Sequence, residues 1–395
     1  MQKPVSILAP AVAALCLLLA GGCEKENKVI KIATQSPLSG NQSAMGMDQK
    51  EGDALAVKQL SGPLTSMGFQ VILAPYDDQA NPDTGVANAK AIVSDPQVLG
   101  IVGHVNSGVQ IPSSEEYHSA GLCNVSPANT NPKVTERGYQ EVSRICGRDD
   151  MQGVVCAQFA KGMGIKTVYV LNDKTTYGQG LAEYFQKEAV NQGIKVVGSA
   201  GTEERANFDA ILSPILSSKA ECLFFGGTFD QVSACFKAAR QKGYMGMLLD
   251  GDGFDSPDSA KIGGESLLKG SGTFYSTIAG PASAYPSAAK FITDFKAEYG
   301  STPNAYATLG YDATAVMLKG IENAAKDAGG KLPTRAQVVK AVRAITTDGL
   351  TGHIAFNGKG DPVSAKYFII QITSADPAKW VENKVCKVLD VKPPE

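Results

Sequence analysis

The sequence predicts an α/β protein of two doubly wound lobes, each with a parallel sheet between layers of helices, joined by a hinge that the chain crosses several times. The chain has 395 residues, which is more than one ordinary core holds and suits two domains of typical size. Short β-branched runs alternate with helical stretches in two successive series. Such alternation requires parallel strands, right-handed crossovers and helices on both faces of each sheet.

The first series of alternating elements starts at Val29. We expect strands at 29–33, 71–74, 98–102 and 122–125, and helices at 45–59, from Pro82 onward and up to Ala120. The second series starts after Arg148-Asp149-Asp150. Its expected helices are 152–161, 178–191, 208–216 and 230–241, and its expected strands are 167–171, 195–199, 222–225 and 247–250. The two series predict two sheets, wound one after the other.

The last third of the chain is mainly helical. We expect helices at 287–299, 311–328 and 335–345, then strands at 351–356 and 366–372 on either side of a turn at 357–360. A helical block followed by one more hairpin indicates that the chain returns to the first lobe and crosses again near its end. We therefore predict a first lobe of 29–148 and 277–364, and a second lobe of 149–276 and 365–395. Rotation about the crossings would open and close a cleft beyond the carboxyl ends of both sheets.

The first 23 residues differ from the rest of the chain. Lys3 supplies their only positive charge, residues 5–20 are largely apolar, and small residues precede Cys23, which predicts a secretory signal. The apolar run is shorter than the ~20 residues of a membrane-spanning helix. Leu-Ala-Gly-Gly-Cys at 19–23 resembles a bacterial lipobox, which implies an acylated Cys23 followed by a tether at 24–28. The alternative is a plain signal peptide with an incidental cysteine. By resemblance to lipoprotein sorting rules, Glu24 favours the outer membrane.

Charge and cysteine content narrow the possible partners. Lys plus Arg total 37 against 39 for Asp plus Glu, so no cationic surface is expected that could neutralise a run of phosphates, and nucleic acid is excluded as a partner. An exported chain can form disulfides, and Cys123 with Cys146 and Cys222 with Cys235 are two candidate pairs. The alternative is that these residues are buried free thiols. The cysteines form no CxxC motif and pair with no nearby histidine, so the sequence does not indicate a zinc site. We expect neither a cofactor nor a metal.

Catalytic motifs are weak or missing. The three histidines, at 104, 118 and 353, are far apart, and GxSxG, GxxxxGK[ST] and a GxGxxG after the first strand are absent from the sequence. Ser287 and Lys290 have the SxxK spacing of acyl-transfer serines, but they open an amphipathic helix and lack the companion motifs. We therefore expect a protein that is not an enzyme.

Small and polar residues instead gather just beyond the expected strand ends. They form five clusters, at 106–108, 126–130, 177–178, 226–228 and 250–253. Small residues let the backbone approach a ligand, and N–H groups at the start of a following helix can hold a carboxylate. Each cluster alone could be turn chemistry, but five on successive strand ends predict a shared cleft.

Several segments, in their order along the chain, give this sequence a resemblance to the leucine-isoleucine-valine binding proteins of bacterial ABC importers. These segments are 37–40 (PLSG), 76–78 (YDD), 103–104 (GH), 126–128 (SPA), 135–139, 148–153 (RDDMQG), 177–182 (YGQGLA), 263–266 (GGES) and 356–361 (FNGKGD). The resemblance runs from about Val29 to near Trp380. It implies the type I periplasmic binding protein fold, with two doubly wound parallel-sheet lobes and a multi-crossover hinge.

The resemblance also implies a ligand site. It places Ser107 and Thr130 on the α-carboxylate of an amino acid, and the carbonyl of Ala128 and the carboxylate of Asp252 on its α-ammonium. Both ends need partners, because a buried unpaired charge costs several kcal/mol. Asp252 stands where the family usually has Glu, and it could instead be a turn aspartate in Asp-Gly-Asp-Gly.

The resemblance places the side chain of the ligand among Met45, Tyr177, Thr228 and Tyr306, with Phe229 close by. Met45 and Thr228 stand where leucine-type binders usually carry tyrosines, so the pocket could be roomier or more polar. Ala80 and Asn106 occupy the two positions of the family's first-lobe disulfide, which is therefore missing.

Together these features predict a periplasmic, lipid-anchored, monomeric solute-binding protein. It would capture an α-amino acid, with Leu, Ile or Val favoured, and deliver it to the permease and ATPase of an ABC importer. One alternative is a binder of the same fold for another amino acid, an amide, urea or an aromatic carboxylate. A second alternative is the ligand-sensing domain of a signalling system.

Overall fold

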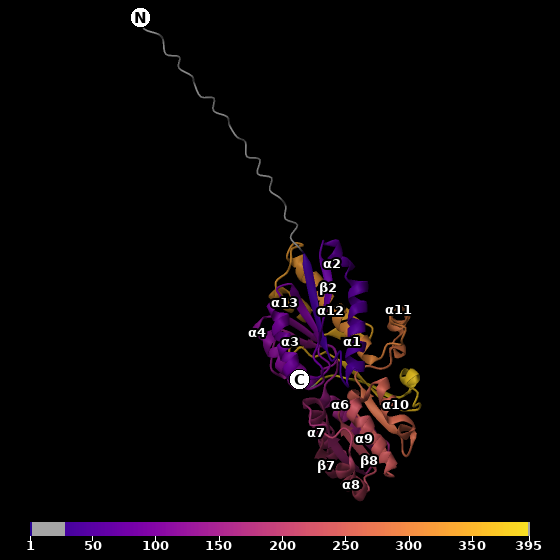
Figure 1. The fold of residues 1–395 in the computed structure, drawn as a ribbon. Helices are drawn as coiled ribbons and strands as arrows, with labels where there is room; N and C mark the ends of the chain where they lie inside the picture. Colours follow the sequence, from indigo (N-terminus) through magenta and orange to yellow (C-terminus); the bar gives the residue numbers. More distant parts are fainter. Residues whose placement is uncertain (2–27, 394–395) are drawn as a thin grey trace.

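The computed structural model describes Met1 and residues 28–393 of the chain (Figure 1). The predicted signal, Cys23 and most of the tether lie outside these residues. Within the described part, no helix combines the length and the apolar character that crossing a membrane would require.

The first sheet has five parallel strands in the order β2-β1-β3-β4-β5. These strands are β1 (Val29–Ser36), β2 (Gln70–Asp77), β3 (Val98–Gly103), β4 (Cys123–Ser126) and β5 (Val142–Arg144). The helices of this lobe are α1 (Ser43–Leu60), α2 (Gly62–Ser66), α3 (Pro82–Ser94), α4 (Ser107–Ser119), α5 (Lys133–Glu136), α11 (Ala289–Tyr299), α12 (Ala305–Asp327) and α13 (Arg335–Arg343). Helices α12 and α13 share one hydrophobic cluster with the sheet, and α3 and α4 share another, so the sheet is covered on both faces.

The second sheet has seven strands in the order β14-β13-β10-β9-β8-β6-β7. Five of them run parallel, namely β6 (Thr167–Asn172), β7 (Lys195–Gly201), β8 (Cys222–Gly226), β9 (Met247–Asp250) and β10 (Thr273–Thr277). Strands β13 (Ala365–Gln371) and β14 (Lys384–Val391) add an antiparallel edge. The helices of this lobe are α6 (Asp149–Gly162), α7 (Thr176–Asn191), α8 (Asp209–Ser218), α9 (Phe229–Gln241) and α10 (Pro257–Gly263).

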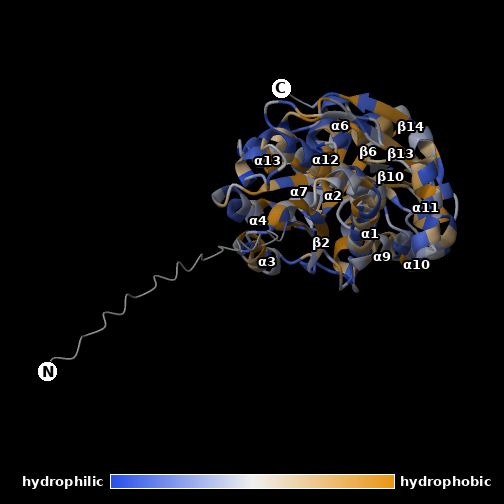
Figure 2. Ribbon diagram, turned by 90° about the horizontal axis from the view of Figure 1, so that it is seen from above, coloured by the Kyte–Doolittle hydropathy of each residue, from blue (hydrophilic) through white to orange (hydrophobic). Residues whose placement is uncertain are grey.

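Strand β8 shows why this sheet is buried on both sides. Cys222 and Phe224 pack with α6 and α7, whereas Leu223 and Phe225 pack with α8 and α9, as the two-residue period of a strand requires. Helices with one buried face carry both hydrophobic and hydrophilic residues, as α11 and α13 do in Figure 2.

The chain passes between the sheets three times. The first crossing is 145–148, between β5 and α6, and the second follows β10 on the way to α11. The third crossing is 356–364, between the small hairpin of β11 (Thr346–Asp348) and β12 (His353–Ala355) and strand β13. Figure 1 shows the consequence: α3, α4, α12 and α13 lie in one lobe, and α6 to α9 lie in the other.

Sequence reasoning missed the strands β5, β10, β11 and β14 and the short helices α2, α5 and α10. Strand β5 has only three residues, β10 mixes threonine and serine with aromatic residues, and most residues of β14 are exposed. None of them offers the apolar run that identified the other strands.

The two candidate disulfides are wrong. Cys123, Cys146, Cys156, Cys222 and Cys235 are buried free thiols, and Cys386 is an exposed one. Cys222 and Cys235 belong to different hydrophobic clusters, on opposite faces of the second sheet. Cys123 packs in the first lobe's core beneath α12, while Cys146 lies in the first crossing beside the carbonyl of Asn129.

Candidate functional site

The eight predicted binding residues all lie where the two lobes meet, and all are buried. Ser107 opens α4 after β3, and Ala128 and Thr130 lie in the loop after β4. Tyr177 lies in the first turn of α7, Thr228 precedes α9, and Asp252 follows β9 in a 3-10 turn at 252–254. Met45 and Tyr306 lie in the first turns of α1 and α12. These positions are carboxyl ends of strands or starts of helices, where α/β folds place ligands.

Apolar parts of both lobes meet here in one hydrophobic cluster. It contains the side chains of Met45, Ala128, Tyr177, Phe229 and Tyr306. The first two and Tyr306 come from the first lobe, and the other two come from the second. The cluster therefore exists only when the lobes face each other closely.

Direct hydrogen bonds also join the lobes. The Asn106 amide donates to Gln42 Oε1 at 2.7 Å, Gln42 Nε2 donates to Thr228 Oγ1 at 3.1 Å, and Thr228 donates to Asp230 Oδ1 at 2.7 Å. The Thr228 hydroxyl is thus committed to a contact between the lobes. Gln42 was not among the predicted site residues, and its role depends on a packing that no local motif reveals.

Asp252 is held by two tyrosines. The Tyr177 hydroxyl donates to Asp252 Oδ1 at 2.9 Å and accepts from the Gly253 N–H at 2.9 Å, while the Tyr306 hydroxyl donates to the Asp252 carbonyl at 3.2 Å. Burial raises the pKa of Asp252 to about 7, although the Tyr177 hydrogen bond opposes this rise. A cationic group beside this carboxyl would restore its ionisation.

Asp149 is a second buried acid at the site, and sequence reasoning missed it. It is the first residue of α6, it is 0% exposed, and the Thr130 hydroxyl lies beside its carboxyl. Burial raises the pKa of Asp149 well above its ordinary range, and the charge of Asp252 raises it further. Segment 148–153 was one of those that carried the family resemblance, so its two acids were the sequence signal that could have identified Asp149 as a site residue.

Neutral polar groups lie beside the two acids. The Thr130 hydroxyl near the Asp149 carboxyl and the Gln152 amide near the Asp252 carboxyl each lower the pKa of the acid they face, which burial raises. A Cβ placed on Gly251 would lie 3.4 Å from Gln152 Oε1 and 2.6 Å from the Tyr177 hydroxyl, so Gln152 and Tyr177 both lie beside the segment that carries Asp252. Buried polar groups of both lobes therefore gather around Asp149 and Asp252.

Ser107 belongs to the first lobe, whereas Gln152 and Asp252 belong to the second. The Ser107 hydroxyl accepts a hydrogen bond from the Asn131 N–H at 3.3 Å, and Asn131 Nδ2 donates to the Thr176 carbonyl at 2.9 Å. A Cβ on Gly108 would lie 3.5 Å from Thr176 Oγ1. The N-terminus of α4 therefore faces the N-terminus of α7, and the next residue of α7, Tyr177, holds Asp252.

Comparison with known proteins matches this architecture. Residues 29–377 match the model of the periplasmic binding protein family. A Leu/Ile/Val-binding protein homolog 2 of Brucella abortus is 30% identical over 371 residues, which cover 93% of this chain and 96% of that protein. A leucine-, isoleucine-, valine-, threonine- and alanine-binding protein of Pseudomonas aeruginosa is 30% identical, with 91% and 94% covered.

Solved structures show the same fold. A leucine-binding protein of Thermotoga maritima superposes with a TM-score of 0.81 at 29% identity, covering 91% of this chain and 98% of that one. A solute-binding protein of R. palustris in complex with benzoate also has a TM-score of 0.81, at 17% identity and with 92% and 98% covered. The predicted fold and the family resemblance are thereby confirmed. This chain belongs to the periplasmic binding protein family.

Proposed function

We propose that this protein captures a free α-amino acid between its two lobes, most favourably leucine, isoleucine or valine, and delivers it to an ABC importer without changing it chemically. The observation that carries the proposal is that hydrogen-bond donors suited to an anion and acids suited to a cation lie on opposite sides of the junction between the lobes. A helix N-terminus with the Ser107 hydroxyl lies on one side, and Asp252, with Asp149 near it, lies on the other. A zwitterion needs both sides at once.

The first lobe would hold the carboxylate. Backbone N–H groups at the start of α4 and the hydroxyls of Ser107 and Thr130 are donors, and the positive end of a helix dipole favours an anion. Thr130 is 1% exposed, and the neighbouring Asn131 N–H donates to the Ser107 hydroxyl, which supports a shared role for Thr130 and Ser107 toward a carboxylate.

The second lobe and the loop after β4 would hold the ammonium. Asp252 and the carbonyl of Ala128 are the proposed acceptors, and Asp149 is a second buried acid nearby, whose pKa is raised by burial. A ligand that contacts both lobes stabilises the closed arrangement, whereas a ligand that contacts one lobe does not.

The proposed pocket for the ligand's side chain is apolar, which supports an aliphatic amino acid. Met45, Tyr177, Phe229 and Tyr306 provide its walls. The Thr228 hydroxyl already pairs with Gln42 and Asp230, so it adds little polarity toward a ligand. Relatives named for leucine, isoleucine and valine binding support the same choice.

Export, lipid anchoring through Cys23, a monomeric state and a separate permease and ATPase complete the proposal. The family match supports a periplasmic location. The sequence at 19–28 supports the anchor and its tether.

A thermal-shift screen tests the ligand class. The panel would contain the common amino acids, their amides, urea and aromatic carboxylates. We expect leucine, isoleucine or valine to raise the Tm most, because a ligand at 100 times its Kd stabilises a folded protein by about 2.7 kcal/mol. A shift with benzoate but with no amino acid would contradict the proposal and favour the aromatic-acid alternative.

Replacement of Ser107 by alanine tests the carboxylate end. We expect Ser107→Ala to weaken amino-acid binding by about 1.5 to 3 kcal/mol, because a hydrogen bond to a charged group is lost. Calorimetry measures the change in Kd. Ser113→Ala is the matched control, since Ser113 is also a buried serine of α4 and lies outside the proposed site. Equal affinities for both variants would remove Ser107 from the site.

A further inference from the structure

The loop that carries Ala128 and Thr130 is tied to the hinge by its backbone. Arg144, the last residue of β5, donates from Nη1 to the Asn129 carbonyl at 2.8 Å and to the Asn131 carbonyl at 2.9 Å. The carbonyl between them, that of Thr130, accepts from the Asp149 N–H at 2.9 Å. Three consecutive carbonyls therefore bind groups at the two ends of the first crossing.

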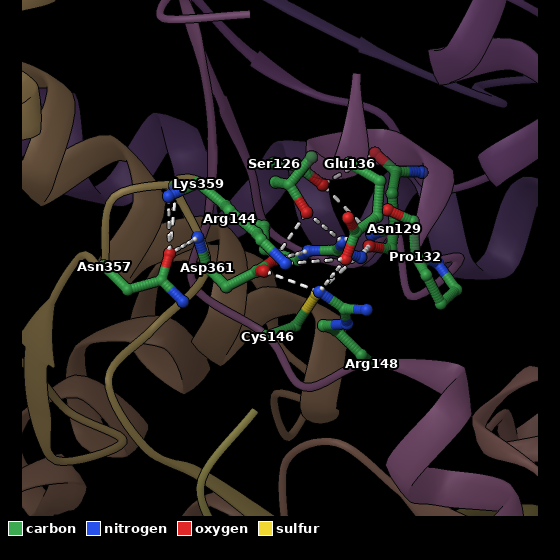
Figure 3. Close-up of polar contacts among 12 residues, drawn as sticks. Ser126, Asn129, Pro132, Glu136, Arg144, Cys146, Arg148, Asn357, Lys359 and Asp361 are labelled. Carbon is green, nitrogen blue, oxygen red and sulfur yellow. Dashed lines mark hydrogen bonds and ion pairs between the residues drawn. The ribbon is translucent and has the colours of Figure 1, made fainter. Parts of the chain in front are cut away.

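The Arg144 guanidinium is itself fixed by a buried carboxylate (Figure 3). Its Nε donates to Asp361 Oδ1 at 2.7 Å, and its Nη2 donates to Thr135 Oγ1 at 2.5 Å. Arg144 and Asp361 are both 0% exposed. Only the planar guanidinium can meet these acceptors together with the two loop carbonyls, because its donors point in fixed directions.

Asp361 joins two of the chain crossings. It lies in the third crossing. Its Oδ1 binds Arg144, just before the first crossing, and its Oδ2 accepts from Nη1 of Arg148, the last residue of that crossing, at 2.8 Å. Burial alone would raise the pKa of Asp361, but Arg144 and Arg148 hold this pKa below its ordinary range. The carboxylate thus stays charged and bridges the two ends of the first crossing.

Stability alone is a poor explanation for such a buried pair. Desolvation of two charges offsets most of their attraction, and well-packed apolar side chains of similar volume often stabilise a core as much. A geometric role explains the arrangement better, because each group contacts either the proposed ligand loop or a crossing.

We propose that Arg144 and Asp361 are positioning residues for ligand capture. They hold the loop at 128–131 so that the Ala128 carbonyl and the Thr130 hydroxyl face the cleft, and Arg148 links this loop to the second lobe through Asp361. The proposal rests on the amino-acid binding proposed above. It adds residues that touch no ligand but set the geometry of those that do.

Asp361→Asn tests the proposal with two readouts. Calorimetry with leucine, or with the amino acid that gives the largest thermal shift, measures the affinity. Hydrogen exchange of the ligand-free protein measures the protection of backbone amides at 126–132. We expect the affinity to fall about tenfold or more and amide exchange in this loop to rise, because the guanidinium loses its charged partner.

Asp312→Asn is the matched control. Asp312 is also a buried carboxylate that fixes a loop, through the Leu350 and Thr351 N–H groups and the Thr351 hydroxyl, but it lies away from the cleft. We expect a lowered Tm for this variant with unchanged affinity and unchanged exchange at 126–132. An effect that follows only from lower stability would appear in both variants.

The outcomes separate this inference from the proposed function. Unchanged affinity and unchanged loop exchange in Asp361→Asn would overturn the positioning role. If the unaltered protein binds no amino acid, the proposed function fails, while loop exchange still decides whether the pair orders the loop. Should Asp361→Asn not fold, Arg144→Lys replaces it with the same readouts, since lysine keeps the charge but not the fork.

Discussion

Asp252→Asn is expected to weaken amino-acid binding by about 3 kcal/mol, or roughly 100-fold in Kd, because the substitution leaves a buried ammonium without its counter-charge. Asparagine has nearly the same shape and can still accept the hydrogen bond from Tyr177, so the loop at 250–254 should keep its conformation. Titration calorimetry of the two proteins with leucine measures the difference.

Asp53→Asn is the control for this variant. Asp53 is fully buried and its pKa is likewise raised by burial to about 7, but its carboxyl binds Thr34 and Thr314 between the first sheet and α12. We expect the control to change stability and to leave the affinity as it is. An Asp252→Asn protein that binds as tightly as the unaltered one would show that Asp252 is only a turn residue.

Amino-acid affinity is expected to rise by up to tenfold per pH unit between about pH 5 and 7, and to level off above that range. The pKa of Asp252 without a cation beside it is about 7, because burial disfavours its charge. An ammonium prefers the ionised carboxyl, so binding below this pH must release a proton. The sign is therefore tighter binding at higher pH.

The raised pKa of Asp252 has the opposite pH effect on the stability of the ligand-free protein. An acid whose pKa is raised by folding binds its proton more tightly in the folded state, so its contribution to stability falls as the pH rises from about 4 to 7. The gain in Tm on adding the amino acid should grow over the same window, because the ammonium offsets the burial of the charge.

Calorimetry in two buffers with different ionisation enthalpies measures the released protons. We expect about one proton per bound ligand near pH 5.5 and almost none near pH 8. A second released proton would show that the ligand also ionises Asp149, whose pKa is raised by the same burial. The affinity of Asp53→Asn should keep its dependence on pH, and that of Asp252→Asn should lose it. An affinity that does not change with pH in the unaltered protein would contradict a role for Asp252 as the counter-charge.

The sequence was informative about the fold wherever strands are fully buried. Apolar runs such as 222–225 are visible without a structure because both faces of the strand contact helices. Strand β14 was not predicted from the sequence, because one side of it has no neighbouring strand and its residues are largely exposed. The disulfide pairs failed because spacing along the chain does not say which face of a sheet a cysteine occupies.

For the site, the family resemblance named residues that the fold brings together at the junction of the lobes, and their roles toward a ligand stay predictions. It did not reveal Asp149 or Gln42. The burial of Asp149 depends on the first crossing, and the contact of Gln42 depends on how closely the lobes approach. Burial and contacts of this kind depend on segments that are distant in the sequence, so a local sequence pattern cannot predict them.

The distribution of the thiols has a practical consequence. Five of the six cysteines in residues 28–393 are buried, four in the two cores and one in the first crossing, and Cys386 alone among the six is exposed, on the outer strand of the second lobe. A maleimide dye would therefore attach to the folded protein at one known place in this region. With a second probe on the first lobe, that dye could report the distance between the lobes in solution, and none of the five buried cysteines within 28–393 would have to be removed.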